Sequence, residues 1–185
     1  MFSEERVTHM AAYFLLKSES RKMPYIKLLK MLYLSERKSF VRWGSSMSGD
    51  NFVSMPHGPV MSQTYDLIRG HVSQKSVWQS FIKDEANYEV SLSEAISEDD
   101  IDELSRAEMK ILDDIHSEFG QMGGFDLVDY THDHCAEWND PNGSSFPISP
   151  EHILRAVGKS EAQIEKLVLK YQESRQLQSI RATLR

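Results

Sequence analysis

The chain has a single cysteine, Cys135, among its 185 residues, so it cannot form an internal disulfide. This low usage is typical of a reducing compartment, and we expect the protein to be cytoplasmic. No apolar run approaches the length of a membrane span, and the first residues lack the basic start and apolar middle of a signal peptide. A positive net charge is also missing, since the formal value is −7, which argues against general binding to nucleic acid.

The motifs of several enzyme classes are absent as well: G-x-S-x-G, H-E-x-x-H, G-x-G-x-x-G and the phosphate-binding loop. The densest polar cluster contains His132, His134 and Cys135, and His57 is a possible fourth metal ligand. Structural zinc sites usually combine two pairs of closely spaced ligands, and the second pair is missing. We therefore expect no cofactor and no enzyme, and keep a metal- or cysteine-dependent hydrolase as the alternative.

Charge is distributed unevenly along the chain. Residues 84–118 contain thirteen acids and two bases, whereas residues 1–40 contain eight bases and four acids. Two interpretations remain open at this point. The acidic run is a solvated face, or it steers a charged partner toward the protein.

Apolar spacing and capping residues predict a single, mostly helical α+β domain with a small antiparallel sheet or hairpin. The predicted N-caps are serines: Ser3, Ser62, Ser105, Ser149 and Ser160. The predicted helices span residues 4–16, 25–40, 63–69, 104–119 and 125–131, with two more opening at 149–151 and at 160. The predicted strands span 52–55, 77–82 and 88–92, and 139–149 is predicted as a loop.

The predicted helix 25–40 has one apolar and one basic side. The basic side carries Lys27, Lys30, Arg37 and Lys38. Glu36 falls on the apolar side, where an unpaired carboxylate is costly. We expect either that Glu36 reaches water at the end of this side, or that it pairs with a histidine such as His57 or His132.

The segment 49–60 combines a short apolar run with two glycines and two prolines. Pro56 and Pro59 fix the backbone on either side of His57 and Gly58, so we expect a strand followed by a rigid elbow. Such an elbow either presents a partner site or simply connects core elements.

Taken in order, these elements resemble one family, the Panacea (SocA-like) antitoxin domain. The resemblance rests on K-L-x-K-x-L-Y in the second helix, G-P-V after the elbow, and T-H followed by Trp138, and it covers roughly residues 25–138. It implies an antitoxin domain at 1–158, followed by a C-terminal helix and polar tail at 159–185. Its motif and structural residues are Glu36, Gly49, Asp50, Gly58, Pro59, Tyr65, Thr131, His132 and Trp138.

The resemblance implies a non-enzymatic antitoxin that neutralises a cognate toxin by direct binding, in a toxin–antitoxin system of the kind often carried by prophages or mobile elements. The alternative mechanism that it implies is an adaptor that delivers the toxin to a Clp-type protease. We expect no membrane partner, and a nucleic-acid-binding regulator is the least favoured function because the total charge is negative.

Two surfaces compete for the partner contact. One is acidic and would meet a basic cleft of the toxin, through Asp99, Asp100, Asp102, Asp113 and Asp114. The other consists of the basic side of the second helix together with the elbow, through Lys27, Lys30, Arg37 and His57.

Overall fold

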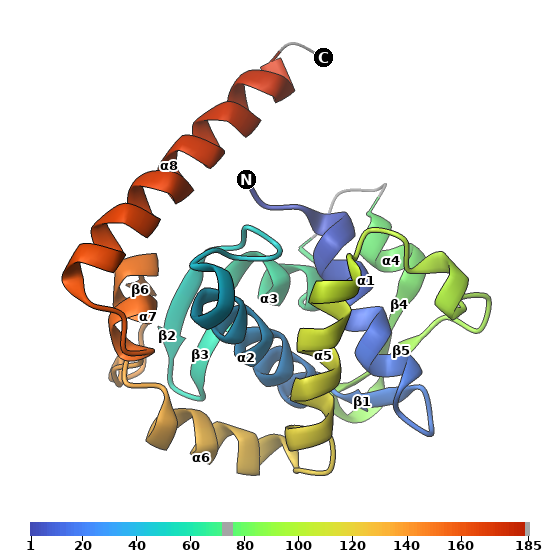
Figure 1. Ribbon diagram of the computed structural model, residues 1–185. Helices are drawn as coiled ribbons and strands as arrows, with labels where there is room; N and C mark the ends of the chain where they lie inside the picture. Colours follow the sequence, from blue (N-terminus) through green and yellow to red (C-terminus); the bar gives the residue numbers. More distant parts are fainter. Residues whose placement is uncertain (72–75, 184–185) are drawn as a thin grey trace.

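The computed structural model describes residues 1–71 and 76–183 of the chain. Within these ranges helices predominate, and six short strands form two three-stranded antiparallel sheets with the orders β1-β5-β4 and β3-β2-β6 (Figure 1). The predicted α+β class is confirmed, with two small sheets in place of one. None of the described helices combines the length and the apolar character that crossing a membrane requires.

Helices and strands alternate irregularly along the chain. The helices are α1 (Glu4–Leu16), α2 (Tyr25–Trp43), α3 (Ser62–Ile68), α4 (Val77–Phe81), α5 (Arg106–Phe119), α6 (Gly124–His134), α7 (Pro150–Ala156) and α8 (Glu161–Thr183). The strands are β1 (Lys22–Pro24), β2 (Phe52–Met55), β3 (Gly58–Met61), β4 (Ile82–Glu85), β5 (Glu89–Leu92) and β6 (Phe146–Ile148). Single 3₁₀ turns cover Ala86–Tyr88 and Glu98–Asp100.

Helix α2 is the centre of the fold. It packs against α5, α6, α1 and the β2–β3 hairpin, and Figure 1 shows these elements on different sides of it, while α8 projects away from the body. Because α2 is covered on several sides, Lys30 has no exposed surface. Lys30, predicted on the basic side of this helix and as a partner contact, therefore lies in the core.

Capping residues in the sequence predict most helix ends correctly. Ser3 accepts a hydrogen bond from the N–H of Arg6, and Ser105 with Glu108 forms the predicted capping box of α5. The predicted cap at Ser62 is wrong, because Met61 occupies the N-cap position of α3. The acceptor that caps this helix comes from the loop before β2.

That acceptor is Asp50. Its carboxylate accepts hydrogen bonds from the N–H groups of Gln63 and Thr64, at 2.9 Å each, and from the Thr64 hydroxyl at 2.6 Å. The Asp50 side chain is 1% exposed, so these donors replace the water that its charge loses. Neighbouring Gly49 has φ +71°, and a Cβ there would lie 2.3 Å from the carbonyl oxygen of Met1. Only glycine fits at that position.

Two sheet predictions fail because tertiary context decides them. The residues Val77–Phe81 form α4 in place of a strand: the carboxylate of Glu4 in α1 accepts hydrogen bonds from the Ser76 hydroxyl and the Trp78 N–H, and Ser76 caps the turn through the N–H of Gln79. The predicted loop 139–149 contains β6, which pairs with β2 from Phe52↔Ile148 to Ser54↔Phe146. A three-residue strand that contains a proline has little local signal, so the pairing partner determines it.

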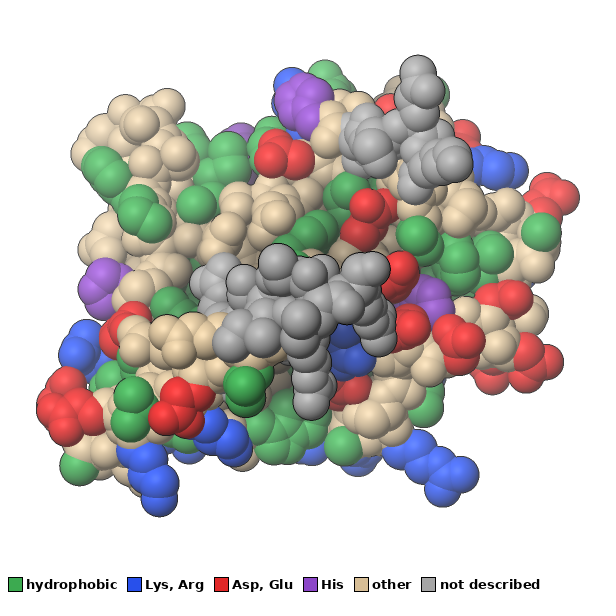
Figure 2. All heavy atoms as spheres, turned by 90° about the horizontal axis from the view of Figure 1, so that it is seen from above, with side chains coloured by type: hydrophobic (Ala, Val, Ile, Leu, Met, Phe, Trp, Pro, Cys, Tyr) green, Lys and Arg blue, Asp and Glu red, His purple; other side chains and the backbone are tan. Residues whose placement is uncertain are grey.

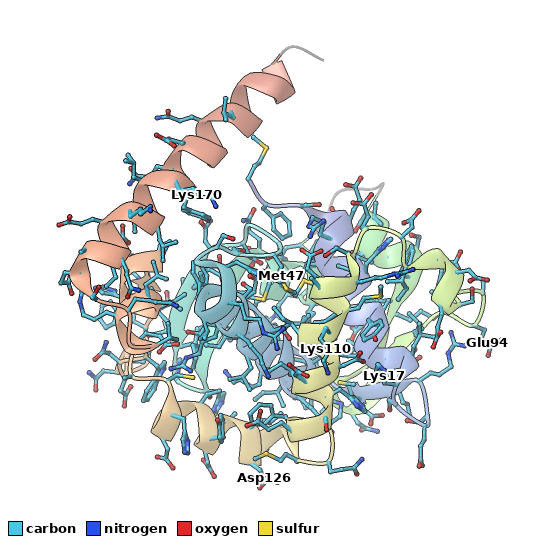
Figure 3. The ribbon with its side chains drawn as sticks, in the orientation of Figure 1. Lys17, Met47, Glu94, Lys110, Asp126 and Lys170 are labelled. Carbon is cyan, nitrogen blue, oxygen red and sulfur yellow. The ribbon has the colours of Figure 1, made fainter. Side chains whose placement is uncertain are left out.

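Glu36 is fully buried, and its partners are backbone and serine side-chain groups of the loop that follows α2. Its two carboxylate oxygens accept hydrogen bonds from the N–H groups of Met47 and Ser48, both at 2.7 Å. Burial raises the pKa of Glu36, and hydrogen bonds from the Ser48 side chain and from the backbone N–H groups of Ser48 and Met47 partly offset that rise. The expectations that Glu36 reaches water or pairs with His57 or His132 are both wrong: it fixes the loop that follows α2, where Figure 3 labels Met47.

Replacing Glu36 with glutamine should destabilise the protein by about 1–3 kcal/mol, because the amide's NH₂ group faces backbone donors and leaves one of them unpaired. For a chain of this size each kcal/mol lowers the Tm by roughly 2–4 °C. Thermal unfolding followed by circular dichroism measures the change, with Glu165→Gln on the exposed face of α8 as the control. Equal Tm values for Glu36→Gln and wild type would contradict this role.

Candidate partner-binding surface

The β2–β3 hairpin is fastened to α2 and α6 at its turn. The Lys30 ammonium donates to the carbonyl oxygen of Pro59 at 3.0 Å. Gly58, with φ +91°, lies so close that a Cβ would be 2.6 Å from the Thr131 hydroxyl oxygen and 3.0 Å from Lys30 Nζ. Burial lowers the pKa of Lys30 to about 7. The glycine of G-P-V is therefore required both by its backbone angle and by the approach of two side chains.

A second buried contact ties α2 to the end of α6. The Tyr33 hydroxyl and Arg37 Nε both donate to Oε1 of Glu137, at 2.6 and 2.8 Å. Arg37 also donates to the carbonyl oxygen of His134, at 3.1 Å. The Glu137 side chain has no exposed surface, and burial together with its charge raises the pKa of Tyr33 well above the ordinary value. Arg37 is thus committed to an internal ion pair.

Trp138 fixes the hairpin from the other side. Its indole N–H donates to the carbonyl oxygen of Met55 at 3.0 Å, and the next backbone N–H, that of Asn139, donates to the Ser54 hydroxyl. The ring of His132 stacks on Trp138 with the centroids 3.9 Å apart. Burial lowers the pKa of His132, and the charge of Lys30 acts in the same direction. The T-H…W residues therefore hold the hairpin.

His57 occupies the turn that these contacts hold, and its side chain is exposed. Its ring meets the ring of Phe125 edge to face, with the centroids 6.0 Å apart. Phe125 lies in the first turn of α6 and is 66% exposed. Figure 1 shows α6 running past the tip of the hairpin, so the turn and this helix share one surface.

The acidic segment after β5 is also exposed. Figure 2 shows red side chains gathered on the side where Figure 1 places this segment, and Figure 3 labels Glu94 at that edge. Within it, Asp100 accepts hydrogen bonds from the N–H and hydroxyl of Ser97, which lower its pKa. Asp102 lies 3.7 Å from Nδ1 of His9. Asp99 is exposed to solvent.

The two acids predicted on α5 are already neutralised within the protein. Asp113 pairs with Lys17 at 2.9 Å and accepts a hydrogen bond from Tyr13. Asp114 has three basic neighbours within 3.3 Å, namely Lys38, Arg42 and Lys110. Figure 3 labels Lys17 and Lys110 near α5.

The basic residues predicted for a partner have internal contacts as well. Lys27 Nζ donates to the carbonyl oxygen of Gly120 at 2.6 Å, and burial lowers its pKa. Lys30 is in the core and Arg37 pairs with Glu137, so of this predicted set His57 is the one on an open surface.

The side chains that a metal- or cysteine-dependent hydrolase would use, His132, His134 and Cys135, are not arranged for catalysis. Cys135 is 1% exposed, and burial together with the charge of Glu137 raises its pKa to about 12, so the thiol stays protonated at neutral pH and is a poor nucleophile. His134 binds the Tyr130 carbonyl through Nδ1 at 3.0 Å. Across residues 1–71 and 76–183, no three His, Cys, Asp or Glu side chains are placed to hold a metal ion.

These contacts define a class of protein: a mostly helical α+β domain whose motif residues brace a hairpin with an exposed turn. The family model described as antitoxin SocA-like, Panacea domain, matches residues 28–139, which is more than half of the chain. The chain belongs to this family. Comparisons with curated proteins and with solved structures give no significant match.

Sequence reasoning misses Phe125 and Glu137 as members of this region. Phe125 and His132 are seven residues apart, the spacing that puts two side chains on the same helix face, and this signal links Phe125 to the T-H motif. For Glu137 no local signal exists, because its partners Tyr33 and Arg37 lie 104 and 100 residues away.

Lys30→Met tests the buried ammonium. In the folded protein the pKa of Lys30 is about 7, against an ordinary value of 10.5, so the unfolded state binds more protons between these values. Wild-type stability therefore gains from rising pH in this window, by at most about 1.4 kcal/mol per pH unit, and methionine lacks the effect. We expect the stability of Lys30→Met relative to wild type to fall by about 2 kcal/mol between about pH 7 and about pH 9.

Urea unfolding at several pH values measures this difference. Lys166→Met, at an exposed position on α8, is the matched control and should track wild type at every pH. A difference between Lys30→Met and wild type that does not change with pH would show that the ammonium titrates equally in both states.

Proposed function

We propose that this protein is an antitoxin that neutralises a cognate toxin by direct contact. The observation that carries the proposal is the family match over residues 28–139, within which Lys30, Gly58, Thr131 and Trp138 hold one hairpin whose turn is exposed. A fold that uses buried polar groups to hold a surface turn presents that turn in one conformation. Preorganisation of this kind lowers the entropy cost of binding a partner.

Direct blocking and delivery to a Clp-type protease both need a protein-binding surface, and we propose blocking as the mechanism. Blocking requires only that the surface cover the toxin. The predicted end of the antitoxin domain, residue 158, falls between α7 and α8. Helix α8 projects from the body and lies outside the proposed antitoxin domain.

The acidic segment 94–103 has a separate part in the proposal. Its exposed carboxylates produce a local negative potential that attracts a basic toxin and speeds encounter. Asp113 and Asp114 contribute less to this field, because their charges are compensated by lysine and arginine neighbours.

Co-expression with the protein encoded by the neighbouring gene tests the function. If that protein stops growth when expressed alone, we expect this chain to restore growth and to co-purify with it. Growth restored in cells that lack Clp-type proteases supports blocking, whereas rescue that depends on the protease supports the adaptor mechanism. Failure to bind or to rescue in either strain contradicts the antitoxin function.

Neutralising the acidic segment tests the steering. The triple variant Asp99→Asn, Asp100→Asn, Asp102→Asn should slow association with the toxin several-fold at low salt and reduce the salt dependence of the rate. Stopped-flow or biosensor kinetics measure both. Asp113→Asn with Asp114→Asn is the comparison, because its charges are already paired and its effect on association should be smaller. An unchanged salt dependence in the triple variant would mean that this segment only keeps the protein solvated.

A further inference from the structure

The exposed rings beside the hairpin turn are the starting point. Phe125 is 66% exposed and His57 meets it edge to face, while His132, two turns further along α6, stacks on Trp138. Phe125 and His132 lie at i and i+7, so they share one face of the helix, and Asp129 lies between them at i+4. We call these five residues the hairpin–α6 surface.

Carboxylates without an ion-pair partner lie along α6 and just after it, and the charges of Asp129, Asp133 and Asp140 act on His132. Asp126, Asp129, Asp133 and Asp140 are all exposed, and none forms an ion pair with any residue that the structure describes. Figure 3 shows Asp126 at the outer edge of α6.

The sequence explains why these charges are unpaired. From Ile111 to Leu154 the chain contains no lysine and no arginine. Asp113 and Asp114 of α5 nevertheless have basic partners, which are Lys17 at the end of α1, Lys38 of α2 and Lys110. The exposed acids of α6 have no such neighbour among the described residues, so their charges are available to a cationic group of another molecule.

The backbone beneath the surface is held in place. The carbonyl of Met55 receives the Trp138 indole, the carbonyl of Pro59 receives Lys30, and Gly58 packs on Thr131. These contacts bracket His57 on both sides. An aromatic centre with a polar rim, held by a braced backbone, has the composition of a protein interface.

We propose that the hairpin–α6 surface is the docking site for the toxin, and that the toxin presents lysine or arginine side chains around an apolar hollow that receives Phe125. This inference rests on the proposed antitoxin function and specifies its contact site. Charge decides against a second copy of this chain as the occupant, because two such surfaces would bring two sets of unpaired carboxylates together. The steering segment 94–103 then guides the approach, and this surface makes the contact.

The experiment measures Kd for the complex with the protein encoded by the neighbouring gene, at low and at physiological salt. Phe125→Ala should weaken binding at least about tenfold, as loss of a central aromatic anchor does. Asp129→Asn with Asp133→Asn should weaken binding several-fold and reduce its salt dependence. Because these side chains are exposed, the Tm of each variant should equal that of wild type.

Matched controls come from α8. Leu169→Ala removes an apolar side chain that is 58% exposed, and Glu165→Gln with Glu173→Gln removes two charges outside the proposed surface. Both should bind as wild type does.

Three outcomes overturn the proposal. If wild type binds and all hairpin–α6 variants bind equally well, the antitoxin function stands and the contact lies elsewhere. If wild type itself does not bind, both proposals fall. If the free protein is a dimer that Phe125→Ala converts to a monomer, with toxin affinity unchanged, the surface joins two copies of this chain.

Discussion

The arrangement of this protein depends on how one helix holds one hairpin. Lys30 reaches from the middle of α2 to the carbonyl oxygen of Pro59, and Gly58 leaves room for the approach. An ammonium group in the core is costly, and its lowered pKa reflects that cost. The contact is therefore weak evidence for stability. Its clearer effect is positional, because it fixes the turn that carries His57.

Other buried polar groups act on neighbouring segments in the same way. Glu36 holds the loop after α2 through two backbone N–H groups, Asp50 caps α3, and Glu137 joins the end of α6 to α2 through Tyr33 and Arg37. Each replaces lost water with a specific donor, so each allows essentially one geometry. Together they explain why residues that look like candidate chemistry in the sequence serve to place backbone, and why the open rings of the hairpin–α6 surface are left for a partner.

The predictability of the fold follows the range of the interactions. The extent of α1, the capping box of α5 and the start of α7 can be predicted, because a serine cap and apolar spacing lie within a few residues of each other. The strand β6 and the cap of α3 cannot, since each depends on a partner outside its own segment, β2 for the strand and Asp50 for the cap. In the candidate site, the motif residues can be named from the sequence, but their roles cannot. Lys30 sits on the basic side of a helical wheel and is nevertheless core, because a hairpin carbonyl lies over it.

The sequence by itself determined the helical α+β class, most helix boundaries, the uneven charge and the family. Composition, periodicity and the order of motifs can be read along the chain without knowing its three-dimensional structure. Only the tertiary structure decided which charges are available. Asp113 and Asp129 are the same residue type on neighbouring helices, yet Asp113 has Lys17 beside it and Asp129 has no ion-pair partner among the described residues. The reason is physical: an ion pair depends on distances in space, and those distances are set by how α1, α2, α5 and α6 pack.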